Sequence, residues 1–343
     1  MNPLPRSKAV SAKASRFTLI DYGFDGGQNR AREEFAREVK AGLLAKPKRL
    51  SCRFFYDRRG SMLFEKICEL PEYYLMRAER AILKRNAKEI AGLFPHSVTL
   101  VELGSGNASK TRILIREFIR RYGALRYVPV DISRSVLEES SRALLKSFPA
   151  LQIMAVSGEY NESLRHLHAE NGRAKLILWL GSNVGNFDRN QAARFLRRVR
   201  AAMGRDDRFL VGIDLRKSPA ILERAYDDRA GVTAEFNKNI LARINRELGG
   251  HFHLDAFQHV AVYENVPGRV EMYLASLRAQ RVRIDALELA IPFAAGERVH
   301  TENSYKYSLQ EIEELATAAG FRLERQWLDR GPRFSVNLLA PAR

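Results

Sequence analysis

A short apolar run that ends in a Gly-Ser-Gly loop places the strongest constraint on the fold. Residues 98–103 (VTLVEL) predict a buried strand, residues 104–106 form the loop, and a helical pattern follows over residues 110–122. A strand, a glycine-containing loop and a helix in this order make up a β-α unit. Free backbone N–H groups at the start of such a helix form a ligand site at the carboxyl end of the strand.

The same alternation continues along the chain. Strand-like runs and helical patterns follow one another at residues 127–130, 136–146, 155–158, 176–180, 191–203 and 209–213. This order predicts an α/β fold with a mostly parallel, Rossmann-like sheet. A last helix over residues 309–319 and two strands over residues 321–327 and 334–339 are expected to add an antiparallel C-terminal edge.

A second domain is expected to interrupt the first, because the alternation is lost after Leu215. Helical and strand-like stretches lie there at residues 221–227, 236–248, 260–263 and 270–277. They predict an inserted α+β domain that binds the substrate. The expected bounds are residues 217–306, with N-terminal contributions near residues 20–36 and 80–96, for the substrate domain, and residues 37–216 plus 307–343 for the cofactor domain.

The N-terminal third is expected to be mostly helical, over residues 33–44 and over residues 56–85 with a break near Pro71. Residues 1–15 are interpreted as a disordered tail, without the apolar core of a signal peptide. No apolar run approaches the length of about 18 residues that a membrane span requires. The two cysteines, Cys52 and Cys68, favour a reducing compartment, so a cytoplasmic protein is expected.

The strong positive charge does not by itself indicate a nucleic-acid partner. The chain has 57 Lys and Arg against 40 Asp and Glu, a formal net charge of +17. The basic residues are spaced along helix faces, as at Arg194, Arg197 and Arg198, and no known nucleic-acid recognition pattern is present. Nucleic acid is therefore an unfavoured partner, and a monomer that acts on a small molecule is expected.

The loop after the first strand favours S-adenosylmethionine over a dinucleotide. Gly104 and Gly106 allow close approach of a ligand, but a dinucleotide loop needs Gly or Ala where Ser109 stands. S-adenosylmethionine has no phosphate. Its methionine part is expected beside Glu102 and Gly104, with Lys110 near its carboxylate.

Two further strand ends carry residues that suit the rest of this cofactor. Asp131 ends the second strand, where its carboxylate can accept both ribose hydroxyls. Glu159 and Tyr160 follow the third strand and offer an acid to the adenine amino group and a ring to its face. Each residue has a plainer reading, since Asp131 can cap a helix and Glu159 can be surface charge. Their order on successive strand ends favours the cofactor.

Beyond these residues the chain resembles a known family over nearly its whole length. It is similar to the histidine N-alpha-methyltransferases of ergothioneine biosynthesis, which trimethylate the amino group of L-histidine to give hercynine. The resemblance rests on residues 56–61 (YDRRGS), 70–74 (LPEYY) with Arg77, 102–106 (ELGSG), 180–187 (LGSNVGNF), 236–237 (FN) with Asn239, and 301–304 (TENS). It implies a class I methyltransferase sheet and, as acceptors, L-histidine and its mono- and dimethyl forms.

The resemblance also implies roles for individual residues. Tyr56 and Asn186 would be catalytic. The other residues would bind the substrate: Tyr73, Gly181 and Tyr226 near its amine and carboxylate, and Met272, Glu302 and Ser304 around its imidazole. The chemistry of Glu302 and Ser304 is consistent with a role in binding the imidazole ring. A carboxylate and a hydroxyl two residues apart on an extended segment face one side and can bind two ring nitrogens. No metal is expected, because methyl transfer from a sulfonium is an in-line displacement.

Other readings stay open. Glu159-Tyr160 stands where the better-known members are expected to have Asp-Phe, and Asn303 and Tyr305 flank the imidazole pair, so another amino acid or a modified histidine could be the acceptor. Glu302 could instead form a surface ion pair with Lys306. A nucleic-acid methyltransferase or binding module is the alternative from another class, although residues 185–187 lack the prolines typical of base-modifying motifs. His251 and His253 are expected to be exposed.

Overall fold

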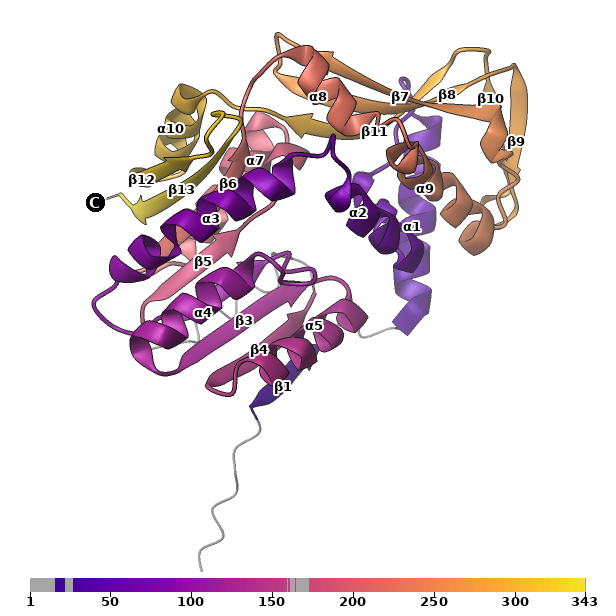
Figure 1. Ribbon diagram of the computed structural model, residues 1–343. Coiled ribbons are helices and arrows are strands. Elements are labelled where there is room, and N and C mark those ends of the chain that lie inside the picture. The colour runs from indigo at the N-terminus through magenta and orange to yellow at the C-terminus, as the bar shows by residue number, and fades with distance from the viewer. Residues whose placement is uncertain (1–15, 22–26, 159, 161–163, 165–172, 343) are drawn as a thin grey trace, which may run out of the picture.

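The computed structural model describes residues 16–21, 27–158, 160, 164 and 173–342. The expected tail and Glu159 lie outside this part of the chain. The described residues form two sheets and a hairpin with helices around them (Figure 1). None of the helices in these ranges combines the length and apolarity needed to span a bilayer.

The main sheet confirms the expected α/β fold. It has eight strands within the described ranges, in the order β1-β4-β3-β2-β5-β6-β13-β12. Only the last pairings, β6 with β13 and β13 with β12, are antiparallel. The strands are β1 (Phe17–Asp21), β2 (Thr99–Leu103), β3 (Leu125–Asp131), β4 (Leu151–Ser157), β5 (Lys175–Trp179), β6 (Arg208–Asp214), β12 (Phe321–Leu328) and β13 (Phe334–Pro341).

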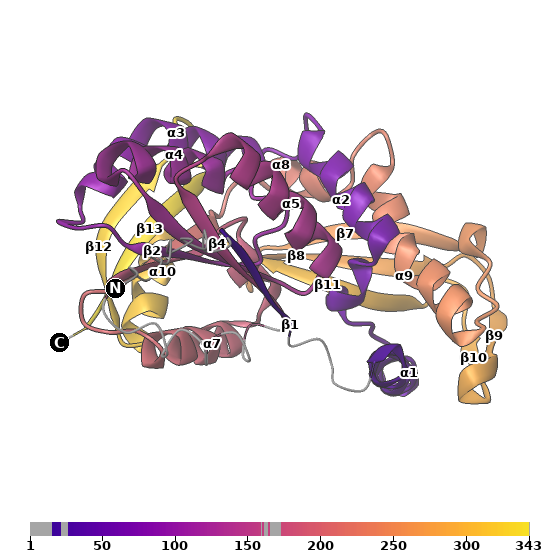
Figure 2. The same cartoon turned by 90° about the horizontal axis from the view of Figure 1, so that it is seen from below.

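Helices cover both faces of this sheet (Figure 2). One face carries α3 (Leu75–Gly92), α4 (Thr111–Tyr122) and α5 (Arg134–Ser147), and the other carries α7 (Arg189–Ala201) and α10 (Leu309–Ala318). Both helices of the second face begin with a capping box, formed by Asp188 with Gln191 and by Ser308 with Glu311. Every residue of β2 and β5 is buried, and most of them are apolar, as expected for a sheet covered on both faces.

The second sheet is antiparallel and lies beside the carboxyl ends of the parallel strands (Figure 1). Its strand order is β11-β8-β7, and β9 and β10 form a separate hairpin. The elements of this part are α8 (Pro219–Tyr226), α9 (Val232–Leu248), β7 (Phe257–Glu264), β8 (Arg269–Ser276), β9 (Gln280–Ile284), β10 (Leu289–Phe293) and β11 (Arg298–Tyr305), with short 3-10 helices η3 (Leu254–Ala256) and η4 (Asp285–Leu287).

The N-terminal helices divide between the two parts differently from the sequence-based expectation. The helices α1 (Gly27–Leu44) and α2 (Arg58–Glu69), with η1 (Cys52–Phe55) between them, pack against α9. In contrast, α3 packs against α4 and β13, because its apolar stripe faces the main sheet. This packing favours placing α3 with the main sheet, and the expected contribution of residues 80–96 to the substrate domain stays a prediction. A division into two domains remains our proposal, with α1 and α2 on the substrate side.

Helix α9 is the central support of the substrate side, and Ile240 on this helix has no exposed surface. We predict that Ile240→Ala lowers the free energy of unfolding by about 2 to 5 kcal/mol, because it removes buried methyl groups and leaves a cavity. The matched control is Ile221→Ala on α8, where the side chain is 38% exposed and the expected loss is below about 1 kcal/mol. Urea unfolding of both variants measures the difference. Equal losses would contradict this packing.

Candidate functional site

The loop after β2 is joined to the end of β3 by backbone hydrogen bonds. The N–H groups of Gly104 and Ser105 donate to the Val130 carbonyl at 2.8 and 3.1 Å. The Gly106 N–H donates to Asp131 Oδ2 at 2.9 Å, and the Ser133 N–H donates to Oδ1 at 3.0 Å. The Asp131 carboxylate is thus fixed by two backbone donors and still keeps accessible surface. Burial raises its pKa, against the effect of these donors.

Gly104 lies where several expected cofactor residues meet. Its φ of 71° is left-handed, and a Cβ added there would lie 2.6 Å from Tyr160 Oη and 3.4 Å from Asn183 Nδ2. A residue with a side chain would therefore be strained and would collide with the Tyr160 hydroxyl. The ring of Tyr160 packs on Trp179 and Phe195, with centroids 6.2 and 5.6 Å away. The glycine at position 104 thus allows the Tyr160 hydroxyl to lie directly against the loop.

Glu102 is a buried anchor at the end of β2. Its carboxylate accepts hydrogen bonds from Thr111 Oγ1 at 2.6 Å and from the Tyr127 hydroxyl. Burial raises its pKa to about 7, although both hydroxyls and the charge of Lys110 favour the ionised form. Both carboxylate oxygens therefore have protein partners, and Glu102 ties β2 to α4 and β3.

Lys110 has a partner that the sequence analysis did not foresee. Its ammonium forms an ion pair with Glu79 on α3, whose side chain is fully buried. The same carboxylate accepts the Gly181 N–H at 2.9 and 3.0 Å. Helical spacing offered a signal, because Glu79 stands among the buried positions of α3, next to Ala78 and three before Ile82. Glu79 thus links α3, α4 and the loop after β5.

Aromatic rings from separate elements meet on the substrate side. Tyr56, between η1 and α2, lies 5.5 Å from the ring of Phe64 and 5.6 Å from Phe236. Tyr73, just before α3, lies 6.3 Å from Phe64 and 6.2 Å from Tyr226 at the end of α8. The structure therefore brings together the three tyrosines that the resemblance assigns to the substrate.

The turn that carries Tyr56 is held by polar contacts to α9. Asp57 caps α2 by accepting the Gly60 N–H at 2.7 Å and also accepts from Asn239 Nδ2 at 2.8 Å. A Cβ at Gly60 would lie 1.7 Å from the Phe55 carbonyl oxygen, so only glycine fits.

Tyr226 is supported from the same helix, α9. Asn237 donates to Nδ1 of the buried His259 at 2.8 Å, and His259 Nε2 contacts the Tyr226 carbonyl at 2.8 Å. Two asparagines of α9 thus position Tyr56 and Tyr226.

Strand β11 carries the expected imidazole-binding pair on one face. Glu302 pairs with Met272 across the sheet, and Ser304 pairs with Val270. Alternate positions on a strand face the same side, so both polar side chains and Met272 belong to one site. Ser304 Oγ lies 2.7 Å from Tyr226 Oη, which connects this site to the tyrosines.

Glu302 is enclosed by protein but keeps some accessible surface, as expected for a side chain that borders a ligand site. Burial raises its pKa to about 7, against the effect of the Lys306 charge. The alternative of a surface ion pair with Lys306 is wrong. Lys306 has no exposed surface, and its ammonium pairs with Asp214 at 2.9 Å.

A close contact between two backbones holds the short helix that carries Asn186 beside β11. It ends η2 (Asn183–Asn186), which packs against β11. A Cβ at Gly185 would lie 2.7 Å from the Tyr305 carbonyl oxygen and 3.5 Å from Ser304 Oγ. Before η2, Gly181 and Ser182 are both left-handed, with φ of 84° and 60°. Strained backbone of this kind is common where a loop is shaped for a ligand.

The tyrosine hydroxyls at the site are protonated at neutral pH. Burial is the main cause that raises the pKa of Tyr56 and of Tyr73 well above the ordinary value, and the charge of Glu302 adds to it. Burial also raises the pKa of Tyr226, against the effect of Lys306. These groups can orient a substrate and relay a proton, but they do not act as anionic bases.

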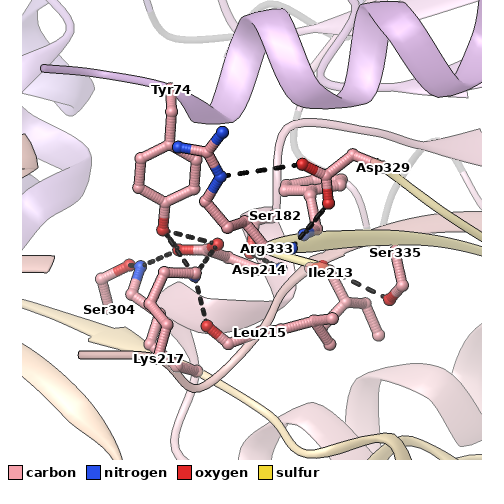
Figure 3. Close-up of polar contacts among 12 residues, drawn as sticks. Tyr74, Ser182, Ile213, Asp214, Leu215, Lys217, Ser304, Asp329, Arg333 and Ser335 are labelled. Atoms are coloured by element: carbon pink, nitrogen blue, oxygen red, sulfur yellow. Dashed lines mark hydrogen bonds and ion pairs between the residues drawn. The ribbon is translucent and has the colours of Figure 1, made fainter. Parts of the chain in front are cut away.

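A buried polar network that the sequence analysis missed lies behind the substrate site (Figure 3). Asp214, at the end of β6, accepts from Tyr74 Oη at 2.8 Å and from Lys217 Nζ at 2.7 Å, in addition to Lys306. Strand alternation offered one signal, because Lys306 continues the series of Glu302 and Ser304 along the same side. The sequence offered no such periodic signal for Asp214, which stands at the end of an apolar strand.

Other reactive side chains have ordinary surroundings. His251 and His253 are exposed, as expected, and His251 lies 3.0 Å from Asp285. Within the described ranges, no group of His, Cys, Asp and Glu could hold a metal ion. Cys52 and Cys68 are free thiols, and burial raises their pKa to about 12 and about 11.

The comparisons with known proteins agree with this geometry. A family described as histidine-specific methyltransferase, SAM-dependent, matches residues 35–341. Histidine N-alpha-methyltransferase of Mycobacterium tuberculosis (strain CDC 1551 / Oshkosh) is 41% identical over 314 residues, 92% of this chain and 97% of that protein. Ergothioneine biosynthesis protein 1 of Neurospora crassa is 33% identical over 302 residues, 87% of this chain and 34% of that protein. A 4-dimethylallyltryptophan N-methyltransferase of Epichloe festucae var. lolii is 27% identical over 310 residues, 84% of this chain and 90% of that protein.

The fold and the loop after β2 define an S-adenosylmethionine-dependent methyltransferase. The chain belongs to the family of histidine-specific methyltransferases. The residues around the loop fit this cofactor, because a Cβ at Gly106 would meet nothing within 4 Å and the carboxylate of the half-buried Asp131 is fixed beside it by two backbone donors. The expected enzyme class and cofactor are confirmed, and the role of each residue remains a proposal.

The raised pKa of Glu102 predicts a pH-dependent stability. A carboxyl with a pKa of about 4.3 in the unfolded chain and about 7 in the folded protein stabilises the fold fully below the lower value. That stabilisation is lost as pH rises through 7. Glu102→Gln cannot ionise, so its free energy of unfolding should fall less than that of the unaltered protein between pH 5 and 8, by up to about 3 kcal/mol. Unfolding by urea at both pH values measures this, with exposed Glu264→Gln as the control. A parallel pH profile for Glu102→Gln would contradict the burial of this charge.

The contact between η2 and β11 predicts a specific glycine requirement. Gly185→Ala places a methyl group against a backbone carbonyl and should displace Asn186, lowering kcat/KM for the acceptor by about 10-fold or more. Gly204→Ala is the matched control, because its Cβ would only touch Asp207 at 3.7 Å. Initial-rate kinetics on folded variants, checked by circular dichroism, test this. Unchanged kinetics in Gly185→Ala would show that the close approach is not required.

Proposed function

We propose that the protein trimethylates the α-amino group of L-histidine to hercynine, with S-adenosylmethionine as the methyl donor. The observation that carries this proposal is the pair of Glu302 and Ser304 on one face of β11, next to Tyr226. A carboxyl group and a hydroxyl at this spacing complement the two nitrogens of an imidazole ring. The similarity to histidine N-alpha-methyltransferase over most of both chains supports the same acceptor.

The amino and carboxylate groups of histidine would lie toward the tyrosines and η2. Tyr56 and Asn186 would orient the amine, while Tyr73, Gly181 and Tyr226 surround its carboxylate end. Bound S-adenosylmethionine supplies an electrophilic methyl group on a sulfonium. Lys110, Asp131 and Tyr160 would hold its carboxylate, ribose and adenine.

The main task of the site is to align the nitrogen lone pair with the methyl carbon, because the N–C bond forms as the S–C bond breaks. A free α-amino group is largely protonated near neutral pH and must lose a proton before each transfer. The protonated hydroxyls of Tyr56 and Tyr73 can accept a hydrogen bond from the amine and pass its proton to water. Their rings also favour the methylated cation, by roughly 0.5 to 2 kcal/mol for each cation-π contact. This attraction would retain the mono- and dimethyl intermediates.

A different amino acid is the second candidate acceptor. The relative from Epichloe festucae acts, by its name, on a prenylated tryptophan, so this scaffold can carry an indole acceptor. In this chain the buried acid at Glu302 favours a ring with nitrogen donors and acceptors.

A nucleic-acid acceptor is less favoured because the site is enclosed by α2, α8, α9 and β11. We further propose that the enzyme is a cytoplasmic monomer, in keeping with its two free thiols.

Mass spectrometry of the product tests the proposal directly. With excess S-adenosylmethionine, L-histidine should gain the mass of one methyl group three times in succession. No mass gain on histidine, together with methylation of tryptophan or tyrosine under the same conditions, would overturn the proposal.

The imidazole site predicts a change of selectivity. Glu302→Ala removes the carboxyl group from the proposed ring contact, so kcat/KM for histidine should fall by about 10- to 100-fold relative to that for tryptophan or tyrosine. Glu264→Ala, an exposed acid on β7, is the matched control and should keep the ratio of the unaltered enzyme. Competition assays with mixed acceptors measure the ratio. An unchanged preference for histidine in Glu302→Ala would contradict the assignment of the pocket.

A further inference from the structure

Lys306 is a buried cation whose three N–H donors all have partners. Its Nζ donates to Tyr226 Oη at 2.8 Å and to Ser304 Oγ at 2.9 Å, and it forms the ion pair with Asp214 at 2.9 Å. Burial disfavours its charge, but the Asp214 carboxylate outweighs burial and raises the pKa of Lys306. The residue is therefore a fixed cation immediately behind the substrate site.

Neutralising Asp214 does not require Lys306. Lys217 already forms a 2.7 Å ion pair with the same carboxylate, and Tyr74 donates to it as well (Figure 3). Two lysines on one carboxylate leave an excess positive charge. The nearest acid in the substrate site is Glu302, whose ionised form is favoured by the charge of Lys306. The second lysine therefore acts on the site rather than on Asp214 alone.

The contacts of Lys306 also determine which way the neighbouring hydroxyl protons point. Tyr226 Oη and Ser304 Oγ each accept a hydrogen bond from Lys306 and lie 2.7 Å apart. Only one hydroxyl proton can occupy the line between these two oxygens. The phenol is the more acidic group, so Tyr226 donates to Ser304. The remaining proton belongs to Ser304, and no described residue is placed to accept it.

The free Ser304 proton lies on the same side of β11 as Glu302, because the two residues alternate along the strand. Ser304 therefore donates a hydrogen bond to the ligand, and Glu302 accepts one. A neutral imidazole has one N–H donor and one bare nitrogen acceptor, which is the complementary pattern. Without Lys306, Ser304 could reverse its role and accept from a ligand.

We propose that Lys306 is a positioning residue for acceptor recognition, which fixes Ser304 as a hydrogen-bond donor to the bare ring nitrogen of the substrate. This inference rests on the proposed histidine methylation. Lys306 does not touch the reacting atoms. Its effect passes through Ser304 and Tyr226 and concerns the ring of the acceptor, not the methyl donor.

The test compares Lys306→Met with Lys217→Met, which removes the other lysine on the same carboxylate. Lys306→Met should lower kcat/KM for L-histidine by about 10- to 100-fold, mainly through KM, with unchanged affinity for S-adenosylmethionine. Lys217→Met should change this value by less than about threefold, because it leaves the contacts of Lys306 with Ser304, Tyr226 and Asp214 in place. Equal losses in the two variants would overturn the inference, since both share the contact with Asp214.

A nitrogen-free acceptor separates positioning from a general structural effect. β-(2-Thienyl)-L-alanine has a five-membered ring without nitrogen, so its kcat/KM should be unaffected by Lys306→Met. When Lys306→Met is added to Ser304→Ala, kcat/KM for histidine should fall little further than in Ser304→Ala alone, because both changes remove the same interaction. Equal losses on both acceptors, or additive losses in the double variant, would overturn the inference.

Two single variants keep the inference testable if Lys306→Met does not fold. Tyr226→Phe leaves the Ser304 proton free and should keep the preference for histidine over thienylalanine, whereas Ser304→Ala should lose it. Loss of that preference in Tyr226→Phe would contradict the assigned donor. If the unaltered enzyme does not methylate histidine, the proposed function is overturned together with this inference. If it methylates histidine but the variants do not show the expected preferences, only this inference is overturned.

Discussion

The ion pair between Asp214 and Lys306 joins the two sheets of the enzyme. Asp214 ends β6 of the main sheet, and Lys306 follows β11 of the antiparallel sheet, and neither side chain has exposed surface. A buried charge is tolerated only when it is paired and hydrogen-bonded, so the two sheets are held in one relative position. That position places the face of β11 that carries Glu302 and Ser304 beside the carboxyl ends of the parallel strands, where we propose that the methyl donor binds.

A second charged contact has the same role near the cofactor loop. Glu79 on α3 receives the ammonium of Lys110 and the N–H of Gly181, which belong to the loops after β2 and β5. Donor and acceptor parts of the site are therefore both built on strand ends and fixed by buried carboxylates. An in-line displacement gains most from such rigid alignment, since a small error in position is costly.

The periodicity of the sequence predicted most of the fold, because buried parallel strands and amphipathic helices leave clear patterns. The strands β1, β9 and β10 were missed, since they are short and lie at edges where burial is incomplete, and β11 was expected only as an extended segment around Glu302 and Ser304. The proposed cofactor residues were named from their order on strand ends, and their roles stay a prediction. The proposed substrate residues Tyr56, Asn186 and Glu302 lie far apart in the sequence, so no local pattern links them, and the resemblance to a family supplied them. Lys306 and Glu79 were missed as site residues although strand alternation and helical spacing each offered a signal, because neither pattern identifies the partner of a buried charge.

We expect the site between β11 and the tyrosines to recognise an imidazole ring. Calorimetry with L-histidine, L-tryptophan and L-tyrosine, each in the presence of S-adenosylhomocysteine, measures this recognition without turnover. Histidine should give a clear binding heat, and the other two should bind at least about 10-fold more weakly. Tryptophan or tyrosine binding as tightly as histidine would show that the site does not select an imidazole ring.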